Sequence, residues 1–132
     1  MTTGSTAHRT YGQPWCPLAR FLDLLGDRWT LLVAREMLFA HPRPLRFGEL
    51  AEELPGISRN LLNSRLRELE AAGIVEPNTG GAARAIGGWG LTERGASLGE
   101  VLRAIGTWGI ENLADPTAAD RRTVRRRLSS LG

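Results

Sequence analysis

The sequence has no lysine, only one cysteine and only two histidines among its 132 residues. A single Cys excludes an internal disulfide framework and a cysteine-based zinc site. His8 and His41 lie far apart and lack partners at metal-ligand spacing, so we expect no metal and no other cofactor. No apolar run approaches the roughly 20 residues that cross a bilayer, and the polar start lacks the apolar core of a signal peptide. These absences predict a cytoplasmic protein without a membrane segment.

Arginine alone carries the positive charge, with 17 Arg against 14 acidic residues and a net charge of +3. The surplus lies at the C-terminal end, because residues 113–132 contain five Arg and two Asp whereas residues 1–112 are balanced. This tail either adds salt-sensitive phosphate contacts or keeps a terminal helix soluble, and we favour the second interpretation. A hydrophobic content of 42% fits a single globular domain.

The composition divides the chain into three segments. Residues 1–15 are polar, with several Thr and Gly, and are expected to form a flexible N-terminal arm. Residues 16–113 hold the regular apolar patterns and are expected to form the folded domain with its dimerisation helices. Residues 114–132 are expected to form an Arg-rich C-terminal helix or tail.

Apolar residues recur at helical spacing in several stretches. They predict helices over 17–25, 28–39, 47–54, 58–72 and 93–113, a last helix from Thr117, and short strands over 74–76 and 91–92. Cys16, Asp27 and Ser58 are expected at N-caps, and Gly73 suits a left-handed position after a helix. The order helix, tight turn, helix, strand, loop, strand, helix is that of a helix-turn-helix followed by a wing. The expected fold class is mainly α with a small β wing.

The predicted helix over 58–72 has two chemically different faces. Leu62, Leu66 and Leu69 share one side, and the opposite side carries Arg59, Asn60, Asn63, Ser64 and Arg67 without a carboxylate before Glu68. Arg bonds guanine and Asn bonds adenine in the major groove, and Ser58 with the helix start suits a phosphate. The alternative is an ordinary amphipathic helix with a solvated face. The short helix and the Pro55–Gly56 turn before it favour DNA recognition.

Other arginines flank this motif. Arg43 and Arg46 precede its first helix and are candidates for phosphate contacts, with a solvated loop as the alternative. Arg84 is the only charge in the loop over 77–91, which makes it the candidate contact from the wing. Arg65 falls nearer the apolar side of its helix, so we assign it a structural role rather than base recognition.

Six short motifs together resemble the HxlR-type transcriptional regulators. They are Cys16-Pro17-Leu18, Gly26-Asp27-Arg28-Trp29-Thr30-Leu31-Leu32, Arg46-Phe47-Gly48-Glu49-Leu50, Pro55-Gly56-Ile57-Ser58, the run from Leu66 to Val75, and Leu91-Thr92-Glu93-Arg94-Gly95. The resemblance covers roughly residues 16–110 and implies a winged helix-turn-helix. It also implies a homodimer built by terminal helices, near-palindromic operators, and DNA-facing positions for Arg59, Asn60 and Asn63. The Gly-rich stretch 78–90 departs from the family's usual wing, and Trp89 stands in place of its aromatic residue.

Cys16 aligns with the Cys that some members of that family use for redox sensing. A thiol at a helix N-cap feels the positive end of the helix dipole, which favours the thiolate. With no second Cys in the chain, any disulfide must be intermolecular or involve a small thiol. The alternative is an inert thiol packed in a dimer seam.

The terminal helices carry more apolar residues than a small core needs. The candidates for a dimer interface are Leu18, Phe21, Leu22, Leu102, Ile105, Trp108, Val124 and Leu128. Alternatively, each of them fills the core of its own chain. A dimer would place two recognition helices roughly 34 Å apart, about one turn of DNA.

The leading hypothesis is a sequence-specific DNA-binding transcriptional regulator that responds to redox state or to an unidentified small molecule. An enzyme is not expected, because the sequence has no catalytic pair at suitable spacing, no phosphate loop and no metal set. Glu52 and Glu53 are more simply a solvated helix face. A winged helix that binds a protein rather than DNA is the second alternative, against which the acid-free Arg and Asn face argues.

Overall fold

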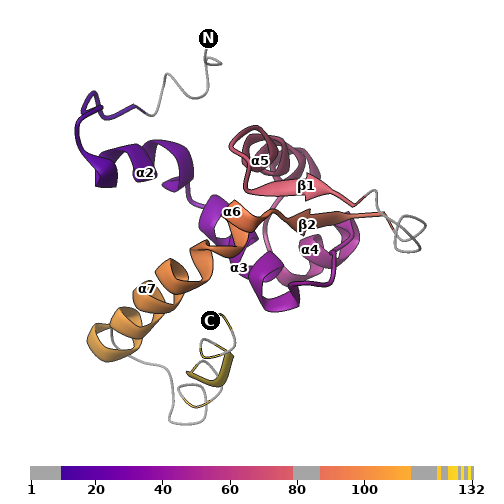
Figure 1. Cartoon of the computed structure of the whole chain (residues 1–132). Helices are drawn as coiled ribbons and strands as arrows, with labels where there is room; N and C mark the ends of the chain where they lie inside the picture. Colours follow the sequence, from indigo (N-terminus) through magenta and orange to yellow (C-terminus); the bar gives the residue numbers. More distant parts are fainter. Residues whose placement is uncertain are drawn as a thin grey trace.

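The structure, a computed structural model, describes residues 10–78, 87–113, 122, 125–127, 129 and 131. Its elements are α2 (Pro17–Leu25), α3 (Thr30–Ala40), α4 (Phe47–Glu53), α5 (Arg59–Ala71), β1 (Val75–Pro77), β2 (Trp89–Leu91), α6 (Glu93–Ala96) and α7 (Leu98–Asn112). Figure 1 shows α3, α4 and α5 gathered around the two strands, with α2 and α7 extending away from them on the other side. The expected mainly α fold with a small β wing is confirmed.

Local chemistry starts α2 and α5 where the sequence predicts. Cys16 is the N-cap of α2, and its Sγ accepts a hydrogen bond from the backbone N–H of Ala19 at 3.4 Å. Ser58 is the N-cap of α5, and its Oγ accepts from the backbone N–H of Leu61 at 3.1 Å. Each cap satisfies one of the amide groups that the first helical turn leaves unpaired.

The end of α5 is a Schellman motif, as the sequence predicts. Gly73 has φ +76°, a left-handed conformation that glycine adopts without a steric cost. Its N–H donates to the carbonyl of Glu70, and the N–H of Ile74 donates to the carbonyl of Leu69, both at 2.9 Å. The motif directs the chain from α5 straight into β1.

The start of α3 lies two residues later than expected. Asp27 still caps this end, because one carboxylate oxygen accepts from the N–H of Trp29 at 2.8 Å and from that of Thr30 at 3.2 Å. These bonds hold Arg28 and Trp29 in a turn, so the helix begins at Thr30 rather than at Arg28. The predicted cap is therefore present, whereas the predicted first residue of the helix is wrong.

The single helix expected over 93–113 is interrupted at Ser97, where α6 ends and α7 begins. The Ser97 hydroxyl donates to the carbonyl of Arg94 at 2.5 Å, a local bond that competes with the helical ladder. Helices α6 and α7 each also pack a glycine closely against another part of the chain. A side chain on Gly95 would overlap the carbonyl oxygen of Ile74, and one on Gly99 would overlap that of Leu131.

The wing strands β1 and β2 pair antiparallel, with Val75 opposite Leu91 and Pro77 opposite Trp89. β2 begins at Trp89, earlier than the sequence predicts, and ends at Leu91. Thr92 opens the following helix as expected, because it is the N-cap of α6. Trp89 also exchanges two backbone hydrogen bonds with Leu45, at 2.8 and 2.9 Å. This pairing joins the hairpin to the segment before α4. The Gly-rich sequence does not predict it.

The core fills the space between α3, α4, α5 and β1. Its fully buried members include Val33, Leu50, Leu62 and Leu66, each with no exposed surface. No helix in the described part of the chain is both long and apolar enough to cross a membrane.

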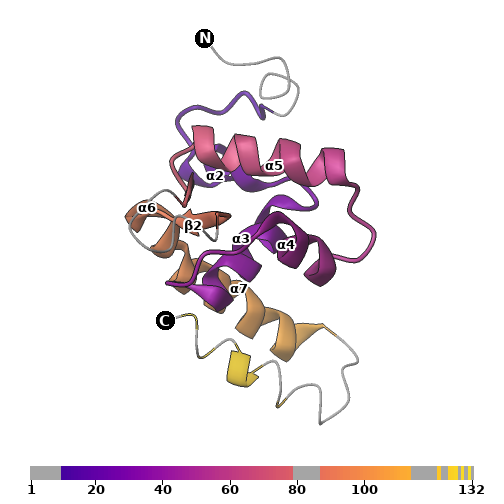
Figure 2. The same cartoon turned by 90° about the vertical axis from the view of Figure 1, so that its right-hand side faces the viewer.

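Part of the C-terminal tail packs back on this core. Leu131 is buried, and the Arg127 guanidinium lies 4.3 Å above the ring of Phe39 and 4.0 Å from Glu36. Figure 2 shows the described tail beside α7, at the opposite end of the molecule from α5. The tail is therefore more than a solubilising extension. Val124, Leu128 and the start of the last helix near Thr117 lie outside the described residues.

Candidate nucleic-acid interface

The buried and the polar residues of helix α5 lie on opposite sides of the helix, as the sequence predicts. Leu62, Leu66 and Leu69 are buried in the core. The residues on the opposite side form what we call the α5 polar face, consisting of Arg59, Asn60, Asn63, Ser64 and Arg67, of which all but the half-buried Ser64 are exposed. Because α3 and β1 pack against the buried side, the polar face projects outward from α5, the second helix of a helix-turn-helix.

Arg59 at the start of this face is held by an aromatic ring. Its guanidinium lies 4.8 Å from the ring centre of Phe47, the first residue of α4. Cation–π contact of this kind orients a cation without consuming its hydrogen-bond donors. The sequence does not single out Phe47 as part of this face. The signal that identifies it is an aromatic residue at the start of one helix followed by an Arg at the start of the next.

Arg65 lies away from the α5 polar face and is held by two carboxylates. Its Nη1 is 2.6 Å from Glu68, and its Nε is 3.5 Å from the carboxylate of Asp27. The side chains of Arg65 and Asp27 are both mostly buried. This ion pair joins the turn before α3 to the middle of α5, and the structural assignment of Arg65 is confirmed.

The same environment shifts the proton affinity of Asp27. Burial acts to raise the pKa of its carboxyl, but the hydrogen bond from Trp29, the charge of Arg65 and the bonds from Thr30 together outweigh burial and lower that pKa below its ordinary value of 3.8. The ionised form therefore stabilises the fold above the unfolded pKa, and this contribution disappears as the pH falls through the lower folded pKa.

The Asp27→Asn variant keeps a capping oxygen but removes the charge that faces Arg65. We expect its free energy of unfolding at pH 7 to fall by about 1–3 kcal/mol relative to the wild type. The difference shrinks as the pH drops below about 4, because the wild-type carboxyl then also becomes neutral. Urea titrations between pH 7 and pH 3 measure it, with the exposed Glu53→Gln as control. If the difference in free energy of unfolding between the wild type and Asp27→Asn stays constant with pH, the role assigned to the charge is wrong.

Arg43 and Arg46, the candidates for phosphate contacts, both face Glu49 of α4. The Nη1 of Arg43 is 3.1 Å from one Glu49 oxygen, and the Nε of Arg46 is 4.0 Å from the other. The backbone N–H of Arg46 also donates to Glu49 at 3.0 Å, and with the Arg43 bond it lowers the pKa of Glu49. Arg43 and Arg46 are exposed and Glu49 is half-buried, so a phosphate would have to compete with Glu49 for these cations.

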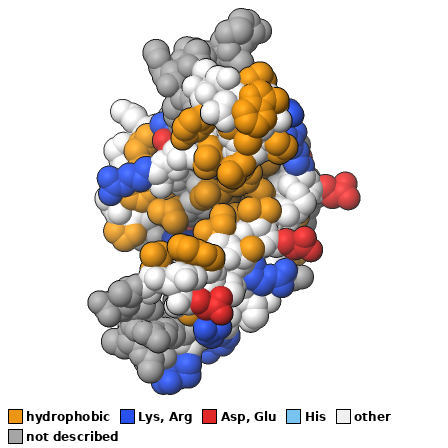
Figure 3. Space-filling model, turned by 90° about the vertical axis from the view of Figure 1, so that its left-hand side faces the viewer, with side chains coloured by type: hydrophobic (Ala, Val, Ile, Leu, Met, Phe, Trp, Pro, Cys, Tyr) orange, Lys and Arg blue, Asp and Glu red, His pale blue; other side chains and the backbone are white. Residues whose placement is uncertain are grey.

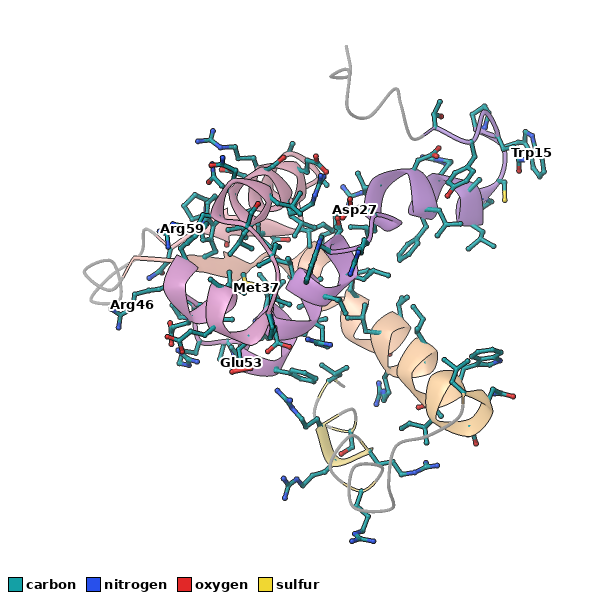
Figure 4. The ribbon with its side chains drawn as sticks, turned by 180° about the vertical axis from the view of Figure 1, so that it is seen from behind. Trp15, Asp27, Met37, Arg46, Glu53 and Arg59 are labelled. Atoms are coloured by element: carbon teal, nitrogen blue, oxygen red, sulfur yellow. The ribbon has the colours of Figure 1, made fainter. Side chains whose placement is uncertain are left out.

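Figure 4 places Arg46 and Arg59 at one end of the molecule and Trp15 at the other. The two arginines thus share an end with the α5 polar face, while α2 and α7 lie away from it. The wing candidate Arg84 lies outside the described residues.

The dimer candidates separate into core and surface. Leu102 is buried in its own chain, and Phe21 and Leu22 are half-buried. Leu18 is 66% exposed, Ile105 51% and Trp108 60%. Figure 3 shows apolar side chains spread over the side of the molecule that carries α2 and α7. We call this surface the α2–α7 face.

Comparisons with known proteins agree with this geometry. The model of the HxlR-like helix-turn-helix family matches residues 24–117. The chain is 39% identical to the HTH-type transcriptional regulator sll1512 of Synechocystis over 87 residues, which are 66% of this chain and 62% of that protein. It is 42% identical to the HTH-type transcriptional regulator Rv3095 of Mycobacterium tuberculosis over 76 residues, which are 58% of this chain and 44% of that protein. The chain therefore spans less than two thirds of either relative.

A solved structure gives the same result for the fold. The reduced form of the transcriptional regulator YodB from Bacillus subtilis superposes with a TM-score of 0.60 at 30% identity, covering 77% of this chain and 98% of that one. Further structures of YodB that match the chain are a quinone-bound form and a diamide-treated form.

Proposed function

The chain belongs to the HxlR-like helix-turn-helix family, and from this membership we propose that it is a DNA-binding transcriptional regulator that acts as a homodimer on a near-palindromic operator. The observation that carries the proposal is the α5 polar face. It presents two guanidinium groups and two amides from an exposed helix, with no carboxylate among them. Arg and Asn are the side chains that bond guanine and adenine bidentately in the major groove.

The support for DNA rather than a protein as the partner is the arrangement around this face. Ser58 and the start of α5 suit a phosphate. Arg43 and Arg46 can also bind one when a DNA phosphate replaces Glu49 as their partner. A mobility-shift assay on the DNA upstream of the protein's own gene tests the proposal. We expect a specific shift that weakens steeply with added salt. If no shift appears, or if unlabelled DNA of the same sequence does not abolish the shift, the proposal is wrong.

A homodimer through the α2–α7 face would bring two α5 helices to one operator. Leu18 and Trp108 expose large apolar surfaces on this face, which a monomer would leave in water. We propose that a second copy covers them and that the two recognition helices then lie about one DNA turn apart.

The Leu18→Glu and Trp108→Glu variants test the dimer. Each puts a charge into the proposed apolar seam, where an unpaired charge is strongly unfavourable. Light scattering at micromolar concentration is expected to give twice the chain mass of 14.4 kDa for the wild type and the chain mass for both variants. Ala71→Glu, on the exposed end of α5, is the matched control and remains dimeric. A monomeric mass for the wild type, or a dimeric mass for both variants, would contradict this proposal.

We further propose that oxidation of Cys16 changes operator affinity. The thiol caps α2, the helix that carries part of the α2–α7 face, and is half-buried. A structure of diamide-treated YodB is among those that match this chain. An oxidant accepts two electrons from two thiolates, which join as a disulfide between two chains or with a small thiol. Diamide is expected to change the mobility shift of the wild type but not that of Cys16→Ser. Equal responses from the two proteins count against the proposal.

A further inference from the structure

The side of α2 that faces α6 borders a hollow of about 530 Å³. Its apolar lining comes from Phe21, Leu24 and Leu25 of α2 together with Ile74 and Leu98. Pockets for small molecules typically have volumes of about 300–1,000 Å³ and combine a mostly apolar lining with a few polar groups. We call this hollow the α2–α6 cavity, and its size suits a compact organic molecule.

The charges in the lining favour an anion. Arg20 and Arg94 both line the cavity, and no described acidic side chain lies within ion-pair distance of either guanidinium. Asp23 is the one acidic residue in the lining, and it is already engaged on both oxygens. One oxygen accepts from the backbone N–H of Tyr11 at 2.8 Å, and the other accepts from the hydroxyl of Thr10 at 3.3 Å. Two cations without described partners therefore flank an apolar hollow.

The cavity also touches the end of the candidate recognition helix. The side chain of Arg94 passes Gly73, where a Cβ would lie 3.8 Å from both Cδ and Nη1 of Arg94. Gly73 and Ile74 are the two residues whose N–H groups close the end of α5. The opposite wall is α2, the helix of the proposed dimer seam. A molecule in the cavity would contact both parts of the protein at once.

We propose that the α2–α6 cavity binds a small monoanion with an apolar body, whose anionic group pairs with Arg20 and Arg94. Charge-assisted hydrogen bonds from Arg to carboxylate or sulfonate are the strong, directional contacts of such a site. The inference rests on the proposed function in one respect, since it supplies a ligand class for the same regulator. Ligand binding itself does not require that the protein bind DNA.

Two fluorescent probes of nearly the same shape test the charge requirement. Anilinonaphthalene sulfonate is an apolar monoanion, and N-phenyl-1-naphthylamine is the same ring system without the sulfonate. We expect saturable binding of the sulfonate to the full chain, and about tenfold weaker binding by Arg20→Gln and by Arg94→Gln, the loss that one charged hydrogen bond gives. The neutral probe is expected to bind all these proteins equally. Arg122→Gln, an exposed arginine of the tail, is the matched control and keeps wild-type affinity for both probes.

Three results would overturn the proposal. They are the absence of saturable sulfonate binding, sulfonate binding that survives the Arg20→Gln and Arg94→Gln double variant, and sulfonate affinity that falls as rising protein concentration forms dimers. The last result would mean that a second copy fills the cavity. Mobility shifts of the same variants without probe separate this inference from the proposed function, because loss of the ligand site leaves operator binding intact.

Discussion

Replacing Arg59 or Asn63 with alanine is expected to weaken operator binding by about 1–3 kcal/mol in each case, which corresponds to roughly 5–150-fold in affinity. Both side chains are exposed on α5, so their removal leaves no cavity in the core. Ala is also the better helix former at both positions, which offsets part of the contact with Phe47 that Arg59→Ala loses, so both variants are expected to fold. A loss of affinity would then report lost DNA contacts. Fluorescence anisotropy with labelled operator DNA measures it.

Two further variants distinguish base recognition from simple charge. Arg59→Lys keeps the charge but lacks the planar fork that bonds guanine bidentately. We expect it to bind unrelated DNA like the wild type and to lose operator affinity nearly as far as Arg59→Ala. Arg122→Ala is the control and keeps operator affinity, because it lies in the C-terminal tail, whose described part Figure 2 shows at the opposite end of the molecule from α5. Wild-type operator affinity in both Arg59→Ala and Asn63→Ala would show that the α5 polar face is not the DNA-reading surface.

The second large effect is on stability. A side chain on Gly95 would overlap the carbonyl oxygen of Ile74 and would lie 3.0 Å from the Leu91 side chain. Gly95 is buried where α6 crosses the start of the wing, so neither neighbour has free space to move into. We expect Gly95→Ala to reduce the free energy of unfolding by about 1–3 kcal/mol, the usual cost of overpacking.

Gly48 provides a matched control for this substitution. It lies in α4, and a Cβ there would meet nothing within 4 Å. Gly48→Ala is therefore expected to raise the free energy of unfolding by about 0.5–1 kcal/mol, because alanine restricts the unfolded chain and favours the helix. Urea titrations followed by circular dichroism compare the two variants with the wild type. A Gly95→Ala protein as stable as Gly48→Ala would contradict the close packing of α6 against Ile74 and Leu91.

The features that the sequence predicted correctly depend on neighbours within one helical turn. Ser58 caps α5 by accepting from the backbone N–H of Leu61, three residues later. The helix ends where the N–H of Gly73 donates to Glu70 and that of Ile74 donates to Leu69. The division of α5 into a buried and a polar side follows from the period of the helix alone. Such signals are readable because every participating residue is close in the sequence.

The features that the sequence did not predict depend on distant partners. The break at Ser97 accompanies the packing of Gly95 on Ile74 and of Gly99 on Leu131. Trp89 extends β2 because it pairs with Leu45. The contact of Arg127 with Phe39 likewise joins the tail to α3. No periodicity or motif predicts contacts of this kind, because each contact forms only when the tertiary fold brings its two partners together.

Recognition of a specific DNA sequence through two copies of α5 leaves a characteristic footprint. Hydroxyl-radical footprinting of the DNA upstream of the protein's own gene reveals it. We expect two protected half-sites about one helical turn apart, roughly 10 base pairs, and loss of this pattern in Arg59→Ala. Uniform protection without half-sites, or affinity for unrelated DNA equal to that for the upstream region, would contradict it.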